Sequence, residues 1–214
     1  MKPNRPLAHR LLVVRHGETE ANAVRRYMGQ SDSPLSERGR KQVERVARRL
    51  SSCEFDVLYA SDLGRARQTA EAIAGASGMD ICFDPRLRER HSGILEGLIA
   101  DEARRRFPDL FARLDTLDPD VAIPGGESAT NVKARVSAFI EEATMHHPGS
   151  MILVVAHGGI ARASLWHLLD IPFRAVRWAR CDNTSICSFV WRHDMWLLET
   201  WNDITHLSCN LGSG

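Results

Sequence analysis

A short apolar phrase that ends in His-Gly occurs twice in this chain. Residues 11–17 read LLVVRHG and residues 152–158 read ILVVAHG. Runs this apolar and this rich in β-branched residues are typical of buried parallel strands, and open α/β sheets bind ligands at the carboxyl edge of such strands. One run alone is equally compatible with an ordinary histidine at a strand end. The repetition favours a functional pair, so we expect neighbouring strands to bring His16 and His157 to one site.

Strand and helix patterns alternate along the rest of the chain. Further strands are predicted at residues 57–60 and 81–83, and an antiparallel hairpin at residues 185–191 and 196–200. Apolar stripes and capping residues predict a helix over residues 36–50 with Ser36 as N-cap, and a helix over residues 63–74 with Ser61 or Asp62 as cap. A third helix is predicted over residues 128–146 with Ser128 as cap, and a fourth from the second His-Gly to residue 169. This order predicts a three-layer α/β/α sandwich with a mostly parallel sheet and an antiparallel hairpin at its edge.

The connections between these elements differ in length. The polar segment from Gly17 to Leu35 is long for a βα connection and is therefore expected to be functional. Residues 84–99 are expected to be a loop, and an arginine-rich helical region follows to about Leu117. No linker divides the chain, and 214 residues are enough for one core, so we expect a single domain over residues 1–214.

Composition excludes several classes of protein. A formal net charge of +1 gives no global reason to expect a nucleic-acid partner. No apolar stretch approaches membrane-spanning length and the start of the chain lacks a signal-peptide pattern, so we expect a cytoplasmic protein with no membrane partner. The cysteines are odd in number and lack metal-binding spacing, so neither a disulfide framework nor a zinc site is predicted; they are Cys53, Cys82, Cys181, Cys187 and Cys209.

Four blocks in a fixed order carry a family resemblance. They are RHGET at residues 15–19 with Asn22, SDLGRARQTA at residues 61–70, LRERH at residues 87–91 and AHG at residues 156–158. With this set, the chain resembles the histidine phosphatase superfamily, the phosphoglycerate-mutase-like enzymes, over nearly its whole length. The resemblance implies that His16 accepts a phosphoryl group in a pocket formed with Arg15, Arg65, His157 and Asn22.

The residue types suit this chemistry. A neutral imidazole can attack phosphorus and form a phosphohistidine, and an unperturbed histidine is largely neutral at physiological pH. His16 therefore needs orientation more than deprotonation, and a backbone carbonyl that accepts from its other ring nitrogen would suffice. Arg15 and Arg65 would match the charge of the phosphoryl oxygens, and a protonated His157 would be favoured beside a dianion. Taken alone, Arg65 would be an ordinary surface arginine.

The leaving oxygen requires a proton, and Glu89 is the candidate donor by its match to the family's Leu-x-Glu-Arg-His-x-Gly stretch. A carboxyl group acts as general acid near neutral pH when burial or the charge of the phosphate raises its pKa. By the same resemblance Arg90 reaches a substrate carboxylate or second phosphate, and Gly17, Thr19 and Gly158 complete the substrate-binding set. No metal or other cofactor is implied.

Three functions remain open. Ser92 stands where the mutases have tyrosine, Gly159 stands where they have asparagine, and residues 98–124 are shorter than the mutases' substrate-covering insertion. PGGES at residues 124–128 and WNDxxHL at residues 201–207 resemble the phosphatase branch. We therefore favour hydrolysis of a small-molecule phosphomonoester. The alternatives are a cofactor-dependent phosphoglycerate mutase and a non-catalytic phosphohistidine-binding module, which would lack the acid or one histidine.

Overall fold

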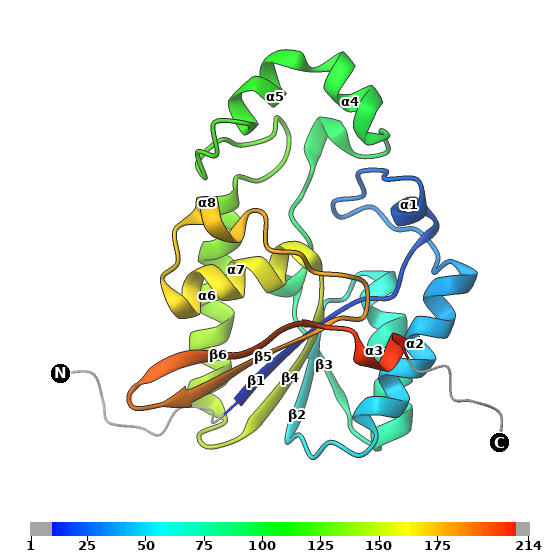
Figure 1. The fold of residues 1–214 in the computed structure, drawn as a ribbon, viewed down its shortest axis with the longest axis vertical. Helices are drawn as coiled ribbons and strands as arrows, with labels where there is room; N and C mark the ends of the chain where they lie inside the picture. The colour runs from blue at the N-terminus through cyan, green and yellow to red at the C-terminus, as the bar shows by residue number, and fades with distance from the viewer. Residues whose placement is uncertain (1–9, 209–214) are drawn as a thin grey trace.

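A computed structural model describes residues 10–208 of the chain, whose centre is a six-stranded sheet (Figure 1). The strands are β1 (Arg10–Arg15), β2 (Val57–Ala60), β3 (Ile81–Phe83), β4 (Met151–Ala156), β5 (Ile186–Arg192) and β6 (Met195–Asp203). Their order is β3-β2-β4-β1-β5-β6; the first four are mutually parallel, and β5 runs antiparallel to both β1 and β6. The predicted sheet, with its antiparallel edge hairpin, is confirmed.

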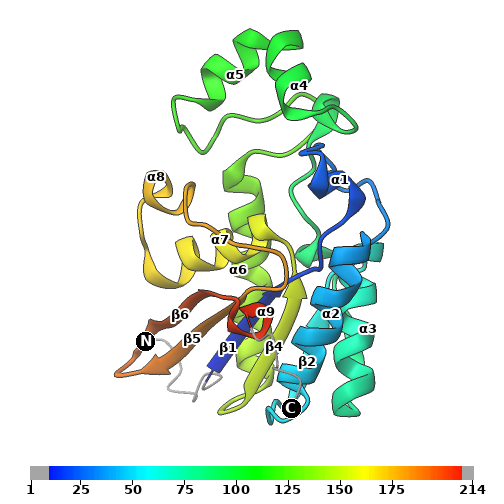
Figure 2. The ribbon, with the colours of Figure 1, turned by 45° about the vertical axis from the view of Figure 1, so that its right-hand side comes forward.

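Helices cover both faces of this sheet (Figure 2). On one side lie α2 (Glu37–Leu50) and α3 (Gly64–Ser77), and on the other α6 (Ala129–His146) and α7 (Gly158–Leu169). The sequence of β1 explains the two layers, because side chains alternate across a strand. Leu11 and Val13 pack into the core beneath α6 and α7, whereas Leu12 and Val14 pack into the core beneath α2 and α3.

The ends of two helices are those that the sequence predicts. The hydroxyl of Ser36 accepts from the Gly39 N–H at 2.9 Å, and Ser128 forms a capping box with Asn131. The start of α3 differs from the prediction, because its N-cap is Leu63, which makes no side-chain cap bond. The Asp62 carboxylate instead accepts from Arg88, and the Ser61 hydroxyl lies 2.9 Å from Nε2 of His157.

The expected loops contain short helices. Residues 20–23 form α1 (Glu20–Ala23), and single 3-10 turns occur at η1 (Pro85–Leu87) and η2 (Gly93–Leu95). The arginine-rich region is two helices, α4 (Ala100–Arg106) and α5 (Pro108–Leu114), because Pro108 starts a new helix and Phe107 before it leaves the helical conformation. Further short helices are α8 (Phe173–Val176) and α9 (Thr205–Ser208).

Helices α4 and α5 lie above the carboxyl ends of the strands, apart from the sheet, in both Figure 1 and Figure 2. They have a small core of their own, formed by Leu95, Ala103, Leu110, Phe111 and Ile123. This segment is joined to the long loop after β1 by backbone hydrogen bonds between Tyr27 and its partners Leu98 and Gly97. The segment from residue 98 to residue 124 therefore forms a cap over the edge at which His16 and His157 lie.

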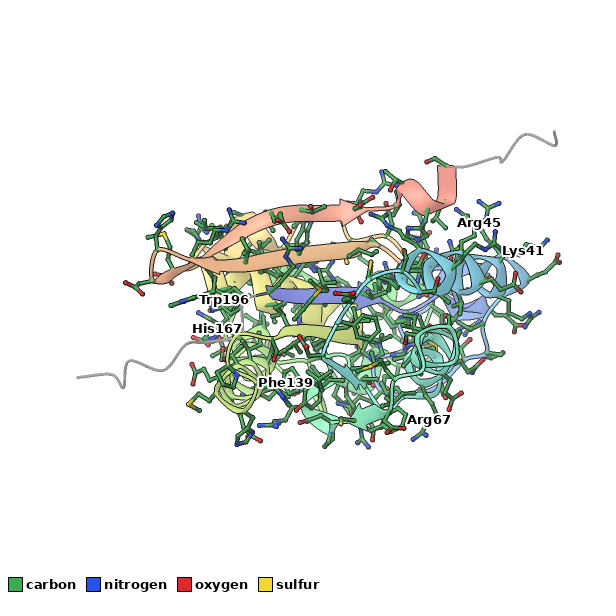
Figure 3. The ribbon with its side chains drawn as sticks, turned by 90° about the horizontal axis from the view of Figure 1, so that it is seen from below. Lys41, Arg45, Arg67, Phe139, His167 and Trp196 are labelled. Atoms are coloured by element: carbon green, nitrogen blue, oxygen red, sulfur yellow. The ribbon has the colours of Figure 1, made fainter. Side chains whose placement is uncertain are left out.

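The outer face of α2 contacts the end of the described chain. Figure 3 shows Lys41 and Arg45 of α2, and Arg67 of α3, directed away from the sheet. Arg45 donates to the Leu207 carbonyl at 2.7 Å, and Arg49 donates to the carboxylate of Asp203. These arginines therefore hold the last described turn, α9, against α2.

Three other expectations concern composition. No helix within residues 10–208 is long and apolar enough to cross a membrane. Among the described cysteines, all with free thiols, Cys53 and Cys82 are exposed while Cys181 and Cys187 are buried. The described residues do not include residues 1–9, which are part of the single-domain and signal-peptide predictions. They also do not include Cys209.

Candidate active site

The two predicted histidines lie side by side at the carboxyl edge of the sheet. Arg15 pairs with Ala156 at the ends of β1 and β4, so His16 and His157 follow in register. Their ring centroids are 5.1 Å apart and the ring planes meet at 61°. Both residues are buried, with His16 3% and His157 0% exposed. The structure thus brings the pair together at the position expected from the repeated strand.

His16 is held in one orientation by its own backbone neighbourhood. Its Nδ1 donates to the carbonyl oxygen of Gly17 at 2.7 Å, which leaves the lone pair on Nε2. Burial, followed by the nearby His157 and Arg15, lowers the pKa of His16 well below its ordinary value of 6.5. The imidazole is therefore neutral at physiological pH, with an unprotonated nitrogen as potential nucleophile.

His157 is also neutral in the absence of an anion. Burial first, and then the charges of Arg65 and Arg15, lowers its pKa well below 6.5. Its Nε2 lies 2.9 Å from the Ser61 hydroxyl, while its buried Nδ1 has no hydrogen-bond partner among residues 10–208. A buried polar atom without a partner is rare and costs free energy. A phosphate oxygen would give this nitrogen a partner and favour protonation of the ring.

Backbone carbonyls accept the hydrogen bonds of Arg15 and Arg65, and Arg65 also lies 3.8 Å from the carboxylate of Asp32. Nη1 of Arg15 donates to the Cys181 carbonyl at 2.5 Å, and its buried Nε has no partner among the described residues. Arg65, in the first turn of α3 and 2% exposed, donates to the carbonyls of Ser31 and Gly29, each at 2.8 Å. Because neutral acceptors take the hydrogen bonds of both guanidiniums, and the Asp32 carboxylate beside Arg65 is more than half exposed at 3.8 Å, their positive charges remain available to an anion.

Asn22 and Thr19 shape the loop that follows His16. They form the capping box of α1, in which the Thr19 hydroxyl accepts from the Asn22 N–H at 3.1 Å. Oδ1 of Asn22 accepts from the Thr19 N–H and from Nδ2 of Asn183, both at 3.2 Å. Both partners donate, so the other amide atom of Asn22 is the NH₂ group, which remains free to donate into the site.

Three residues of the predicted substrate-binding set do not line the cavity. Thr19 is fully buried and occupied as a cap. Gly17 lies behind His16, with its N–H donating to the Thr69 hydroxyl at 3.1 Å and a would-be Cβ only 2.6 Å from the Val43 side chain. Gly158 starts α7 beside Arg15. These residues support the geometry of their neighbours.

Glu89 faces the same edge from the loop between η1 and η2. Its Oε1 accepts from the Arg90 N–H at 2.8 Å, and its Oε2 accepts from the Gly159 N–H at 3.1 Å. Burial raises the pKa of Glu89, but these two N–H donors, together with the charges of Arg162 and Arg65, lower it below its ordinary value. Of the two expected causes of a raised pKa, burial is therefore outweighed in the free protein by these hydrogen bonds and charges, and the charge of a bound phosphate stays a prediction.

An arginine that the sequence analysis missed fixes the loop that carries Glu89. Nε and Nη2 of Arg135, on α6, bind the carboxylate of Glu127 at 2.8 and 3.0 Å. The same guanidinium donates to the backbone carbonyls of Arg86, Arg88 and Glu89. Glu127 in turn accepts from the His91 N–H at 2.9 Å. Nothing in the sequence of a helix distinguishes such an arginine from its solvent-exposed neighbours.

The loop before β5 supplies a second missed contact. The side-chain amide of Asn183 donates to the His16 carbonyl at 3.0 Å, and the Thr184 N–H donates to the carbonyls of Arg15 and His16. These bonds hold the backbone at the end of β1 from the side opposite β4. Residues 183 and 184 carry no local sequence signal, because their role depends on the return of the hairpin to β1.

These groups surround a cavity of about 310 Å³ beneath the cap. Six predicted residues line it, namely Arg15, His16, Asn22, Arg65, Glu89 and Arg90. Its remaining lining comes from the loop after β1, from α6 to α8, and from Ser92 and Ile123. Within residues 10–208, no three His, Cys, Asp or Glu side chains are grouped as metal ligands. The cavity therefore presents arginine cations, the Glu89 carboxylate and the neutral His16 to a ligand, while the predicted His157 lies against His16 but is not among the lining residues.

Comparison with known proteins places this arrangement in a family. The model of the histidine phosphatase superfamily (branch 1) matches residues 11–204, and the chain belongs to that superfamily of enzymes. Probable phosphoglycerate mutase GpmB of Photorhabdus laumondii is 40% identical over 207 residues, which cover 91% of this chain and 93% of that protein. The family resemblance drawn from the four sequence blocks is confirmed.

Solved structures with the same fold include phosphatases. A mycobacterial glucosyl-3-phosphoglycerate phosphatase in complex with vanadate has a TM-score of 0.82 and 33% identity, and covers 91% of this chain and 99% of its own. YhfR of Bacillus stearothermophilus has a TM-score of 0.85 and 32% identity over 94% of this chain and 100% of its own. The α-ribazole phosphatase of Shigella flexneri has a TM-score of 0.81 and 26% identity, and the match covers 91% of this chain and 96% of that protein.

Proposed function

We propose that this chain hydrolyses small phosphomonoesters through a phosphohistidine on His16. The observation that carries the proposal is the neutral, fixed imidazole of His16, whose Nδ1 donates to Gly17. Nε2 attacks phosphorus, an N–P bond forms and the ester P–O bond breaks. Arg15, Arg65 and His157 stabilise the charge on the transferring group, which is the main protein contribution in phosphoryl transfer.

Glu89 protonates the leaving oxygen in this proposal. Its carboxylate is charged in the free protein, so the proton is taken up when a phosphate dianion binds beside it, or arrives on the ester monoanion. After the alcohol leaves, the Glu89 carboxylate accepts a proton from a water molecule. The water oxygen attacks phosphorus, the N–P bond breaks, and inorganic phosphate leaves with His16 restored.

Two local features support hydrolysis over mutase activity. Ser92 lines the cavity where the mutases have tyrosine, so one substrate anchor is absent. A Cβ at Gly159 would lie 2.1 Å from Oε1 of Glu89, so an asparagine there, as in the mutases, would require the Glu89 carboxylate to take another position than the one seen here. When the enzyme does not retain the dephosphorylated product, water rather than that product accepts the phosphoryl group from the phosphoenzyme.

Phosphoglycerate mutase activity is the second candidate, because the GpmB relatives at 40% identity carry that name. A phosphohistidine-binding module without turnover is disfavoured, since both histidines and the acid are present at one site. The deciding experiment gives the protein 3-phosphoglycerate with and without 2,3-bisphosphoglycerate, next to a panel of sugar, nucleoside and aryl phosphates. Release of inorganic phosphate from esters supports hydrolysis. Formation of 2-phosphoglycerate that depends on the bisphosphate, without phosphate release, would replace it with mutase activity.

A further inference from the structure

The sequence motif WNDxxHL, residues 201–207, lies outside the cavity that His16 lines. It forms the end of β6 and most of α9. In Figure 1 and Figure 2, β6 leads directly into α9, which lies beside α2. Side chains of this motif nevertheless connect to the phosphoryl pocket, because they bind the loop of residues 181–184 that precedes β5.

The loop before β5 contacts three residues of the predicted phosphoryl pocket. The Cys181 carbonyl accepts from Nη1 of Arg15 at 2.5 Å. The side-chain amide of Asn183 donates to the His16 carbonyl at 3.0 Å and to Oδ1 of Asn22 at 3.2 Å. A shift of this loop would therefore move a guanidinium, the nucleophile and a potential phosphate donor together.

Thr184, the last residue of this loop, has a strained backbone. Its φ is +59°, in the left-handed region that β-branched residues rarely adopt, and it is fully buried. Its N–H donates to the carbonyls of Arg15 and His16 at 3.0 and 3.2 Å, so the strained conformation directs this N–H at the end of β1. Such a conformation persists only where the surrounding contacts fix it.

A directed chain of hydrogen bonds from α2 fixes Thr184. Its hydroxyl donates to the Asn183 carbonyl at 2.7 Å, and the same oxygen lies 3.2 Å from Nε2 of His206. Because the hydroxyl proton is already used, Nε2 is the donor in this second contact and carries the ring proton. Nδ1 of His206 then accepts from Nη1 of Arg49 at 3.3 Å. Burial first, and the charge of Arg49 second, lowers the pKa of His206 to about 4, which keeps the ring neutral for this double role.

Asn202 fixes the other end of the same loop. Its Oδ1 accepts from the Asp182 N–H at 2.6 Å, and its Nδ2 donates to the Asp182 carboxylate at 3.0 Å. The neighbouring Trp201 donates from Nε1 to the Arg180 carbonyl at 2.6 Å. Asn202 has a φ of +57°, which asparagine adopts more readily than most residues. The motif thus holds the loop at two points, through Asp182 and through Thr184.

We propose that His206 and Asn202 are positioning residues, which hold the backbone of His16 through the loop before β5. They touch neither the substrate nor the reacting atoms. Without their contacts Thr184 can leave its strained conformation, and the imidazole of His16 loses its fixed line of attack. The inference rests on the proposed function for the reaction that it assists, whereas the positioning itself is tested by ligand binding.

Vanadate and phosphate separate the position of His16 from the charge of the pocket. Vanadate can adopt the five-coordinate geometry of the transition state and so needs His16 in place, whereas phosphate needs mainly the positive charge. Binding of each anion to the full chain is measured by titration calorimetry. In His206→Leu, vanadate should bind about 10-fold more weakly, a smaller loss than the ~10²-fold that a 1 Å shift can cost, and phosphate affinity should change much less. Unchanged vanadate affinity, or an equal loss for both anions, would overturn the proposal.

Two further variants separate the contact of His206 from the general attachment of α9. His206→Gln retains an N–H donor near the position of Nε2 and should recover most of the vanadate affinity. The matched control is Thr205→Ala, because Thr205 is an exposed residue of α9 that accepts from Arg49 at 2.8 Å and otherwise binds only Asp203 through its side chain. A loss in Thr205→Ala equal to that in His206→Leu would reduce the effect to loosening of α9 and overturn the proposal.

The route through Thr184 is tested by a double-mutant cycle. Thr184→Val removes the hydroxyl with little change in shape. Its loss of vanadate affinity should not add to that of His206→Leu, because the two variants break the same hydrogen bond. Additive losses would overturn the route through Thr184. If His206→Leu fails to fold, Asn202→Gly, which tolerates the positive φ but lacks the side chain, should show the same selective loss of vanadate, and its absence would overturn the proposal.

Turnover is assayed separately with phenyl phosphate. In His206→Leu, kcat should fall in parallel with vanadate affinity, whereas KM should change much less. Absence of phosphate release from the unmodified protein, with the vanadate pattern intact, would overturn the proposed hydrolysis and leave the positioning role standing. Phosphate release with the same kcat in all variants would overturn the positioning role and leave the hydrolysis standing.

Discussion

Arg135 and Glu127 form an ion pair with two hydrogen bonds beneath the loop that carries Glu89, the proposed proton donor. Nε of Arg135 lies 2.8 Å from Oε1 of Glu127, and Nη2 lies 3.0 Å from Oε2. Nη1 and Nη2 of Arg135 also donate to the backbone carbonyls of Arg86 and Arg88, which precede Glu89, and of Glu89 itself. The pair thus sets the position of a carboxylate that it does not touch, so Arg135 is a positioning residue.

Replacement of Arg135 should therefore impair proton donation more than binding. Arg135→Gln removes the paired geometry, and a shift of the acid by about 1 Å costs on the order of 10²-fold in rate. We expect kcat for alkyl phosphates to fall by about that factor, with KM and the rate on p-nitrophenyl phosphate changed much less, and Arg135→Lys to recover part of the loss. Arg105→Gln, at an exposed residue of α4, is the control. Equal loss on alkyl and aryl esters would mean that Arg135 only supports the fold.

The sequence predicts the sheet well because its strands are encoded locally. Residues 11–14 and 152–156 are apolar on both sides, as a strand covered by two helical layers requires. The caps Ser36 and Ser128 are encoded in the same local way. Pro108 also marks the boundary between α4 and α5 locally, but the sequence analysis treated the arginine-rich residues around it as one helical region.

The functional site is less predictable, because long-range contacts determine it. The pairing of His16 with His157 follows from two strands, yet Arg135, Asn183 and Thr69 act through bonds that cross the fold. The lowered pKa of Glu89 is a result of the same kind. Two backbone N–H groups, one of them from Gly159 on α7, and the charges of Arg162 and Arg65 together outweigh its burial, and no feature near residue 89 predicts that.

The nucleophile can be trapped. Brief incubation with a ³²P-labelled ester followed by a quench without acid should label the protein, and the label should be stable in alkali and lost in acid, as expected for a phosphohistidine. His16→Asn should abolish labelling and turnover, whereas His146→Asn, at an exposed histidine of α6, should leave both unchanged. Activity like that of the unmodified protein in His16→Asn would eliminate the proposed mechanism.

The phosphoryl pocket should function without a metal ion. Because guanidiniums and imidazoles supply the donors, excess chelator should leave the rate nearly unchanged, and vanadate should inhibit. Arg65→Ala removes a buried cation and should cost on the order of 10²-fold or more in kcat. Arg67→Ala, two residues along α3 and on its outer face in Figure 3, should have little effect. Activity lost on chelation and restored by a divalent cation would contradict this account.

His206 should make stability sensitive to mild acid. Burial first, and the charge of Arg49 second, lowers its pKa from 6.5 to about 4. The unfolded chain therefore takes up a proton before the folded one, so this contribution is complete above pH 6.5 and is lost as the pH falls toward 4. In thermal melts at decreasing pH across this range, His206→Gln should lose less stability than the unmodified protein does. His146→Gln should show the same pH dependence as the unmodified protein. Identical pH dependence of stability in all three proteins would exclude His206 as a source of the acid sensitivity.

The last prediction separates proton donation by Glu89 from a purely electrostatic role. Glu89→Gln retains the shape but has no carboxylic proton, so alkyl phosphates should react about 10²-fold to 10⁴-fold more slowly, the usual worth of general acid catalysis. An aryl ester such as p-nitrophenyl phosphate has a good leaving group and should be affected much less.

The pH profile gives the sign of the effect. Because the pKa of Glu89 is lowered in the free protein, the required proton enters with the substrate, whose second ionisation has a pKa of about 6. For alkyl esters, kcat/KM of the unmodified protein should therefore fall as the pH rises above that value. This decline should weaken or disappear in Glu89→Gln, because the variant no longer uses that proton. Equal slowing of alkyl and aryl esters with an unchanged profile would show that Glu89 positions the loop or the phosphate, and the donor would then have to be another acid between Asp84 and Glu102.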